Sequence, residues 1–179
     1  MANYIWHPCA QLKEEKRFPP PVADRAEGIY IYDEQGNRYM DMISSWWCTL
    51  FGHGNPRLNT VAKAQIDKME HVIFAGFTHR PAEELCERLV KRLPKGLNRF
   101  LVVDNGSSAV EVAMKLSYQY HYQVGKPEKQ RFMALSGGYH GETIGALSVG
   151  GMDRYTRIFE NLLIDTIHVQ GPDLSLIHI

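Results

Sequence analysis

Apolar and polar positions in the first half of the chain follow two different spacings. Between residues 28 and 41, two β-rich runs flank a turn of Asp, Gly and Asn, and this arrangement predicts a β-hairpin. From Asn55-Pro56 onward, apolar residues recur at helical spacing, which predicts a helix with Asn55 as its cap and Pro56 in its first turn. A second helix is expected from Pro81 until the stop at Pro94.

Further along, the pattern changes to short apolar runs separated by helical segments. The runs predict strands at residues 99–104, 131–135 and 164–169. Helices are expected after the first two strands, one with Ser108 and Glu111 in a capping box and one from about Glu142. Strands that alternate with helices predict an α/β layer with a mainly parallel sheet. We therefore expect residues 1–55 to form an N-terminal arm and small-domain segment, and residues 56–179 to form an incomplete large domain.

Composition and charge are typical of a soluble globular protein. Hydrophobic residues make up 44% and charged residues 22% of the 179, which disfavours disorder and coiled coils. Lys and Arg (20) balance Asp and Glu (20), so nothing marks a surface for nucleic acid or anionic membranes. No apolar run reaches the ~20 residues of a membrane helix, and the N-terminus lacks the features of a signal peptide. We expect a soluble, cytoplasmic protein.

The three cysteines, Cys9, Cys48 and Cys86, are widely spaced and form no C-x-x-C pair. This spacing disfavours a zinc site or a disulfide framework. Free thiols in a reducing compartment are the favoured interpretation, and no metal is expected.

The turn that follows residues 99–104 is the first candidate for chemistry. Asn105-Gly106-Ser107-Ser108 combines a glycine, hydroxyl groups and a helix start, which gathers backbone N–H groups and the positive end of a helix dipole around one point. A phosphate group suits that point, although an ordinary strand-to-helix connection would carry the same residues. The turn matches neither G-x-G-x-x-G nor the Walker A pattern, which disfavours a dinucleotide or a nucleoside triphosphate.

Residues 136–143, Ser-Gly-Gly-Tyr-His-Gly-Glu-Thr, are the second candidate. They follow a predicted strand at the edge where α/β proteins bind ligands, and their small residues allow a ligand to approach the backbone. Tyr139 adds a flat ring and a hydroxyl, but a glycine turn with a packed tyrosine is an equal alternative. His140 and Glu142 match the H-x-E of zinc deaminases, but the required P-C-x-x-C is absent and that interpretation fails.

The third candidate is the Trp46-Trp47 pair within residues 44–54, where no periodicity is evident and a loop is expected. Paired tryptophans belong to a core more often than to a ligand wall. Two of them in one loop are nevertheless hard to bury without a pocket or a partner surface. Gly-x-Ser-x-Gly is absent, so a serine-hydrolase elbow has no support.

Taken together, these segments resemble the class III pyridoxal-phosphate-dependent aminotransferases, from Trp6 to about Ile167. The most specific pieces are Trp6-His7-Pro8, Ser44-Ser45-Trp46-Trp47, His71-Val72-Ile73-Phe74, Thr78-His79, Asp104-Asn105-Gly106-Ser107, Ala109-Val110-Glu111-Val112-Ala113-Met114-Lys115 and Gly138-Tyr139-His140-Gly141. The resemblance implies an α/β fold, the fold-type I transferase, of which this chain would be the N-terminal part. It also implies a homodimer that holds pyridoxal 5'-phosphate between a large and a small domain.

Position by position, the resemblance implies a role for each motif residue. Gly106 and Ser107 would bind the cofactor phosphate, and Tyr139 would lie beside the cofactor ring and the substrate. Trp46 would form a substrate-contacting wall, with Trp47 as its neighbour.

Two positions depart from the family pattern. Cys9 follows Trp-His-Pro where the best-known members carry a substrate-contacting tyrosine, so that hydrogen bond is in doubt at this substrate-binding position. Glu142 stands where an aspartate is usual, which lengthens that contact by one methylene.

The Trp-His-Pro and Ser-Ser-Trp-Trp segments point to the branch of the family that serves biotin synthesis. The implied reaction moves an amino group from S-adenosylmethionine to 8-amino-7-oxononanoate and gives 7,8-diaminononanoate. Transfer between ω-amino acids and pyruvate or 2-oxoglutarate is one alternative, and a non-catalytic fragment that binds only a partner or phosphate is another.

No catalytic residue is expected within this chain. In this family the lysine that attaches the cofactor and the aspartate that pairs with its ring nitrogen come from beyond residue 179. Lys115 follows the phosphate turn on the predicted helix and is expected to face solvent. We therefore expect an inactive N-terminal fragment with an exposed apolar sheet face and poor solubility. Residues after about 170 lack any structural cue, and whether they are native is left open.

Overall fold

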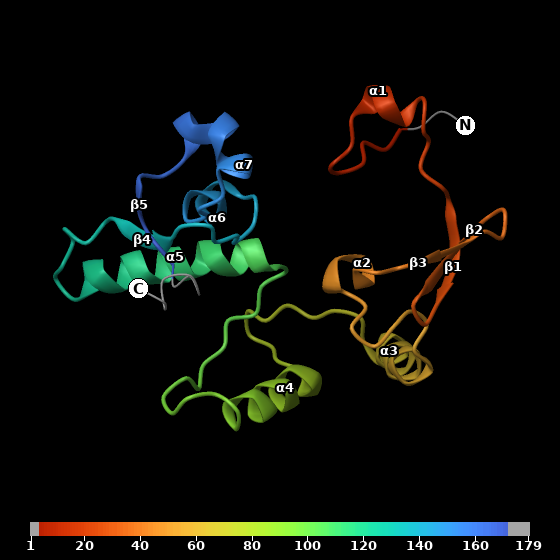
Figure 1. Cartoon of the computed structure of the whole chain (residues 1–179). Coiled ribbons are helices and arrows are strands. Elements are labelled where there is room, and N and C mark those ends of the chain that lie inside the picture. The colour runs from red at the N-terminus through yellow and green to blue at the C-terminus, as the bar shows by residue number, and fades with distance from the viewer. Residues whose placement is uncertain (1–3, 172–179) are drawn as a thin grey trace, which may run out of the picture. The chain divides into compact units, whose positions relative to one another are not determined.

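The computed structural model describes residues 4–171, and the chain divides after Glu83 into two compact units (Figure 1). Each unit has its own sheet, three-stranded in the first and two-stranded in the second. The boundary that we expect after residue 55 concerns the domains of the complete protein and stays a prediction. Residues after about 170, whose origin we left open, lie almost entirely outside the described range.

The sheet of the first unit is antiparallel, in the order β1-β2-β3. It consists of β1 (Ala23–Glu27), β2 (Tyr30–Asp33) and β3 (Arg38–Met40), preceded by the short helix α1 (Leu12–Glu15). The pairing of Tyr30 with Met40 confirms the hairpin that the sequence predicts at 28–41. Strand β1 was not predicted, because its sequence ADRAE lacks apolar alternation and it forms only through backbone pairing with β2.

The turn between β2 and β3 is organised by the Asp33 side chain, which is only 3% exposed. Its carboxylate accepts hydrogen bonds from the backbone N–H groups of Gln35 at 3.0 Å and Asn37 at 2.8 Å. It also accepts from the Asn37 amide and the Tyr39 hydroxyl, both at 2.8 Å. These donors, above all the Asn37 side chain, lower the pKa of Asp33.

Two helices follow the sheet, as the sequence predicts. Helix α3 (Pro56–Lys68) starts at a proline, and the Asn55 side chain accepts from the N–H groups of Arg57 and Leu58. Helix α4 (Arg80–Val90) begins one residue before the predicted Pro81. The α3 start was predictable because its cap and first-turn proline act within a few residues, and the α4 start was indicated by the proline in its first turn.

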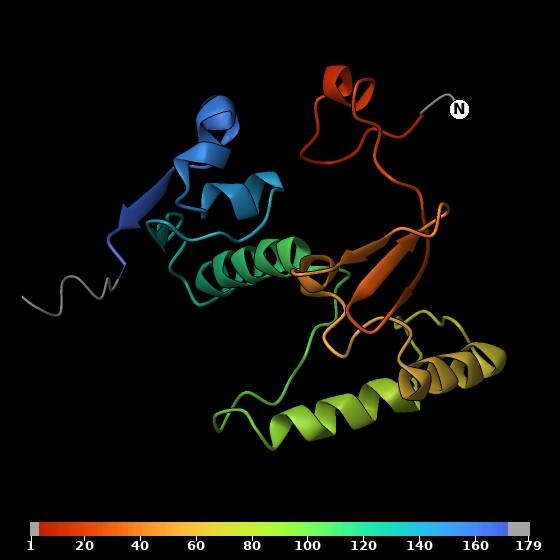
Figure 2. The same cartoon turned by 45° about the vertical axis from the view of Figure 1, so that its right-hand side comes forward.

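The second unit alternates helices with two strands. Its elements are α5 (Gly106–Gln123), β4 (Phe132–Leu135), α6 (Ile144–Ser148), α7 (Asp153–Thr156), the 3₁₀ helix η1 (Arg157–Leu162) and β5 (Thr166–Val169). Strands β4 and β5 pair in parallel, with Leu135 opposite Val169, so the later two predicted strands and their parallel direction are confirmed. Helix α6 packs against α5, and the two helices lie side by side in both views (Figure 2).

The strand predicted at 99–104 does not form. These residues lead into α5 without regular structure, and no part of the described chain offers them a backbone partner. An apolar run becomes a strand only when a neighbour satisfies its N–H and C=O groups, and that neighbour is not determined by the run itself.

The core of the second unit gathers around α6. Its buried apolar side chains among residues 4–171 are Met114 from α5 and Ala146, Leu147 and Val149 in and after α6. Many other large apolar side chains are exposed, for example Leu116 at 55% and Met133 at 67%. The α5-α6 contact therefore holds most of the buried side chains of residues 4–171, and it lies next to the turn of residues 105–108.

Candidate functional site

Helix α5 begins at Gly106, directly after the residue that caps it. The Asn105 side-chain oxygen accepts from the N–H of Ser108 at 2.9 Å, and the Asn105 carbonyl accepts from the N–H of Ala109 at 3.1 Å. The capping box predicted between Ser108 and Glu111 is therefore wrong. Asn105 caps the helix, because its short side chain already reaches the Ser108 amide from the position before the first turn.

The cap leaves two backbone donors of the first turn unused. Within residues 4–171 the N–H groups of Gly106 and Ser107 have no protein acceptor. They stand at the positive end of an 18-residue helix, where an anion gains from both the hydrogen bonds and the dipole. Nothing lies within 4 Å of a Cβ built on Gly106, so the approach to its amide is open. The end of α5 thus fits a phosphate group.

One carboxylate stands close to these donors. Asp104 accepts from the side-chain amide of Asn105 at 3.0 Å, and hydrogen bonding by the Ser108 side chain is the main cause that lowers the pKa of Asp104. Asp104 is therefore ionised at neutral pH, and a phosphate bound at α5 depends on the two free amides to offset that charge.

Glu111 ties this helix to the next candidate segment. Its Oε1 accepts from the Thr143 hydroxyl at 2.6 Å, the N–H of Gly145 at 2.8 Å and the N–H of Ala146 at 3.3 Å. The Thr143 hydroxyl above all lowers the pKa of Glu111. A Cβ on Gly145 would overlap the Glu111 carboxylate, so the close approach requires glycine there. Glu111, predicted as a cap for its own helix, instead caps α6.

The two candidate loops of the second unit meet at Ser107. Gly141 has φ +116° and lies so close to Ser107 that a Cβ on Gly141 would overlap the Ser107 hydroxyl. Such a φ is accessible to glycine and rarely to other residues. The structure therefore places residues 136–143 against the first turn of α5, although more than thirty positions of sequence separate Ser107 from Gly141.

Tyr139 lies in the same loop, with its side chain half exposed. Its hydroxyl donates to Glu142 Oε1 at 3.2 Å, and its ring centroid lies 5.5 Å from that of Tyr155. The longer side chain of Glu142, one of the two departures from the family pattern, thus reaches back to the Tyr139 hydroxyl. Tyr139 presents its ring at the surface of the loop that contacts α5.

In the first unit, the loop predicted at 44–54 contains a left-handed turn. Four consecutive residues of α2 (Ser44–Trp47) have positive φ, between 47° and 66°, and none of them is glycine. A left-handed helical conformation costs about 1–2 kcal/mol for each L-residue, so surrounding contacts must hold it. No residue of this segment signals such a turn, because left-handed backbone is normally predicted from glycine or asparagine.

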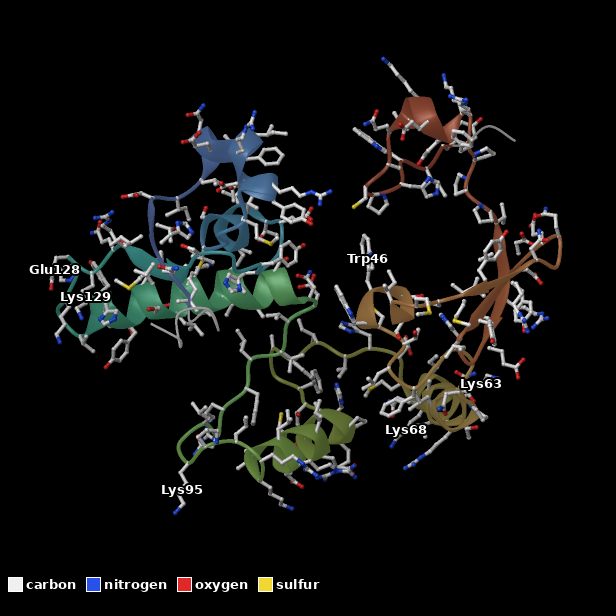
Figure 3. The ribbon with its side chains drawn as sticks, viewed as in Figure 1. Trp46, Lys63, Lys68, Lys95, Glu128 and Lys129 are labelled. Atoms are coloured by element: carbon white, nitrogen blue, oxygen red, sulfur yellow. The ribbon has the colours of Figure 1, made fainter. Side chains whose placement is uncertain are left out.

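The turn presents both tryptophans to solvent. Trp46 is 57% exposed and Trp47 82% exposed, and the Trp46 side chain points away from the ribbon of α2 (Figure 3). Neither tryptophan is part of a core in the described chain. The ligand-wall interpretation of this pair therefore stays a prediction, and the core alternative is disfavoured.

Asp41 holds the turn, and sequence reasoning missed it. Its carboxylate accepts from the N–H of Ser45 at 2.9 Å and from the Ser45 hydroxyl at 2.7 Å. Nε2 of His53 lies 2.8 Å from the same carboxylate. The backbone and side-chain bonds from Ser45 and the bond from His53 lower the pKa of Asp41 to about 2.

Cys9 also lies in the first unit, with positive φ of 59° and an exposed free thiol. Cys9, Trp46 and Trp47 thus belong to one unit, and Gly106, Ser107 and Tyr139 to the other. All of these role assignments remain predictions.

The lysines of the described chain are exposed. Lys115 is exposed on α5, as expected. Lys129 follows the C-terminal end of α5, opposite to the end that begins at Gly106 (Figure 3). Among residues 4–171, no group of three or more His, Cys, Asp or Glu side chains could hold a metal ion. No helix in that range is long and apolar enough to cross a membrane.

Comparisons with known proteins agree on one family. The sequence pattern described as "Aminotransferase class-III" matches residues 11–178. The adenosylmethionine-8-amino-7-oxononanoate aminotransferase of Helicobacter pylori is 43% identical over 171 residues, which is 95% of this chain and 39% of that protein. The chain thus spans about two fifths of the length of the curated relatives it matches.

Solved structures give the same result. The crystal structure of the enzyme of that name from Methanocaldococcus jannaschii matches with a TM-score of 0.88 and 38% identity, over 94% of this chain and 39% of that one. An omega transaminase from Pseudomonas jessenii in complex with PMP matches with a TM-score of 0.86 and 30% identity, over 94% and 38% of the two chains.

Proposed function

This chain belongs to the class-III aminotransferases, and we propose from that membership that the complete protein transfers an amino group from S-adenosylmethionine to 8-amino-7-oxononanoate. The product would be 7,8-diaminononanoate, an intermediate of biotin synthesis. The observation that carries the proposal is the pair of free amides at the start of α5, against which the Tyr139 loop packs. The names of the relatives at 35–43% identity supply the substrates.

The cofactor of this reaction is pyridoxal 5'-phosphate, and the residues present fit it. Two unused N–H donors at a helix start suit its phosphate, and an exposed tyrosine ring in the adjoining loop suits a flat heteroaromatic ring. When bound, the cofactor acts as an electron sink for the carbanion formed during amino transfer.

The residues of this chain would bind and orient the cofactor and the substrate. Gly106 and Ser107 would donate their N–H groups to the phosphate, and Tyr139, whose hydroxyl donates to Glu142, would pack beside the cofactor ring. In the complete protein, Trp46 and Trp47 form an apolar wall for the amino acceptor. By the resemblance to the family, Cys9 would contact the substrate with a thiol in place of a phenol, so its hydrogen bond to substrate would be weaker.

In the complete protein, residues outside this chain would carry out the proton transfer. A lysine and an aspartate from the remainder of the complete protein would move the proton and pair with the cofactor ring nitrogen. We further propose that the complete protein is a cytoplasmic homodimer that binds small molecules and neither nucleic acid nor membranes. Gel filtration of the complete protein tests the dimer.

The test is an assay of the complete, cofactor-loaded protein with 8-amino-7-oxononanoate and either S-adenosylmethionine or an ω-amino acid as donor. Formation of 7,8-diaminononanoate with S-adenosylmethionine is the expected result. The matched control is the variant Gly106→Asp/Ser107→Asp, whose added carboxylates should abolish cofactor binding. Wild-type cofactor affinity in this variant would contradict the assignment of the phosphate site.

The alternative function is amino transfer between ω-amino acids and pyruvate or 2-oxoglutarate. The observation that favours it is the TM-score of 0.86 with an omega transaminase. Turnover with these substrates and none with S-adenosylmethionine would select it. Absence of cofactor binding by the complete protein would instead favour a non-catalytic role.

A further inference from the structure

We propose that Asp41 is a positioning residue which, through Ser45 and together with His53, holds the Trp46-Trp47 turn in its left-handed form and thereby sets the affinity for the amino acceptor. The effect on the acceptor rests on the proposed function, since that function assigns the tryptophans to the substrate wall. The hold of Asp41 on the turn does not rest on it.

The left-handed turn has few bonds of its own. The N–H of Trp47 donates to the carbonyl of Ile43 at 2.9 Å, and the N–H of Thr49 donates to the carbonyl of Ser44 at 3.1 Å. The tryptophan side chains are largely exposed and contribute little packing. Since consecutive L-residues do not favour positive φ, contacts from outside the turn must select this conformation.

Asp41 supplies those contacts. It binds both the backbone N–H and the hydroxyl of Ser45, which is the second of the four left-handed residues. A carboxylate can accept all of these bonds and that from His53 at once, whereas an asparagine has a single acceptor oxygen. Charge-assisted bonds of this kind are stronger than neutral ones, so an ionised Asp41 suits the task.

Asp41 and His53 are themselves held by backbone hydrogen bonds to residues of the hairpin. Asp41 directly follows β3, and its N–H donates to the carbonyl of Ile29 at 2.8 Å. His53 exchanges backbone hydrogen bonds with Gly28 at 3.0 and 2.8 Å. The side chains of Asp41 and His53 are 6% and 15% exposed, in contrast to the tryptophans they support. Two largely buried, hydrogen-bonded side chains, Asp41 and His53, thus support the turn that exposes Trp46 and Trp47.

Asp33 offers a matched control in the same sheet. It is also a well-bound carboxylate that organises a turn, but its partners are Gln35, Asn37 and Tyr39. Loss of Asp33 should therefore reproduce a general weakening of the sheet without a direct effect on Ser45.

The experiment compares Asp41→Ala, Asp41→Asn, Ser45→Ala and Asp33→Ala in the complete protein. Fluorine NMR of fluorotryptophan-labelled protein, without any amino substrate, reports the two side chains, with resonances assigned by Trp46→Phe and Trp47→Phe. We expect both resonances to shift and narrow toward those of a free side chain in Asp41→Ala, to change less in Ser45→Ala, and to stay unchanged in Asp33→Ala.

Kinetics then test the effect on the acceptor. In Asp41→Asn we expect KM for 8-amino-7-oxononanoate to rise about tenfold, a difference of about 1.4 kcal/mol, with KM for the donor unchanged. Unaltered tryptophan resonances in Asp41→Ala, or equal changes in Asp33→Ala, would overturn the proposal. If the wild type does not use 8-amino-7-oxononanoate, the proposed function fails, and the NMR comparison still decides the role of Asp41. If Asp41→Ala does not fold, Ser45→Ala and Asp41→Asn provide the comparison.

Discussion

Glu111 shows how one side chain can connect two loops that the sequence treats separately. It lies on the helix that starts with the phosphate turn, and it binds the loop and the helix that follow Tyr139. A capping-box spacing predicted a local role, because local spacing is all that a sequence window contains. The actual partners lie 32 to 35 positions away, and no local rule points to them.

Replacing Glu111 by Ala should destabilise the second unit. The change leaves the Thr143 hydroxyl and the amides of Gly145 and Ala146 without an acceptor, which costs about 1–3 kcal/mol. Urea unfolding of the complete protein measures it. Glu111→Gln keeps one acceptor oxygen and should lose less, and equal losses in both variants would contradict the role of the carboxylate.

Because the pKa values of Glu111 and Asp41 are lowered, we expect the stability of the folded protein to fall in acid. Both have a folded-state pKa below the ordinary value, Glu111 from 4.5 and Asp41 from 3.8 to about 2. Their contribution is complete above the unfolded pKa and is lost as the pH falls through the folded one. Urea midpoints at neutral pH and at about pH 3 should therefore differ less in Asp41→Asn than in the wild type.

Gly141 offers a sharp test of the contact between the two loops. Gly141→Ala both strains a backbone at φ +116° and pushes a methyl into the Ser107 hydroxyl, so cofactor affinity should fall about tenfold or more. Gly125→Ala strains a residue at φ +76° with open space around it and should cost stability alone, about 1–2 kcal/mol. Titration with pyridoxal phosphate separates the two. Equal affinities would place Gly141 away from the phosphate.

At the scale of elements, the longer helices α3, α4 and α5 were the most predictable part, whereas the short helices α1 and α7 and the 3₁₀ helix η1 were not predicted. The start of α3 was predicted from its Asn55 cap, since a cap acts within three residues, whereas α5 is capped by Asn105 and not by the predicted Ser108. The prediction of a strand at 99–104 was wrong, because a strand needs a pairing partner and no nearby part of the sequence supplies one. The left-handed turn of α2 was not predicted, because Asp41, which holds it, looks in the sequence like an ordinary polar residue at the end of a hairpin. Of the candidate site, the sequence predicts a phosphate at the turn of residues 105–108 and a ring contact at Tyr139, and both roles stay predictions. Asp41, which binds Ser45, was not predicted.

The two asparagine caps give a matched pair of variants. Asn55→Ala and Asn105→Ala should each cost about 1 kcal/mol of stability, because each removes an acceptor from a first-turn amide. Asn105→Ala alone should also weaken cofactor binding, since it loosens the turn that presents the Gly106 and Ser107 amides. Calorimetry and cofactor titration of both variants check this, and an equal loss of affinity in Asn55→Ala would argue against the α5 site.

At the scale of the whole chain, the main feature is the large number of exposed apolar side chains. One apolar hollow of about 360 Å³ is lined by residues of α5 and β4 together with His140 and Val149. Monomeric soluble proteins rarely leave such surfaces uncovered. The expectation of an exposed apolar sheet face agrees with the many exposed side chains, whereas poor solubility is still a prediction.

The 179-residue chain by itself should bind a hydrophobic dye such as ANS and should unfold without a sharp transition. Added pyridoxal phosphate should change neither property, because the attaching lysine is expected elsewhere in the complete protein. Dye fluorescence and thermal melts measure both, with the complete protein as control. A chain that binds no ANS and unfolds in one sharp transition would contradict the expectation.

The bond from Thr143 to Glu111 closes a loop of only 32 residues, and it has a consequence for biosynthesis. Short loops close at low entropic cost, and the earlier part of a polypeptide emerges from the ribosome first. The contact between α5 and the loop that leads into α6 can therefore form on the nascent chain as soon as both segments have emerged from the ribosome. Ribosome-arrested chains that end well past Ala146 would then already protect the Gly145 amide from exchange.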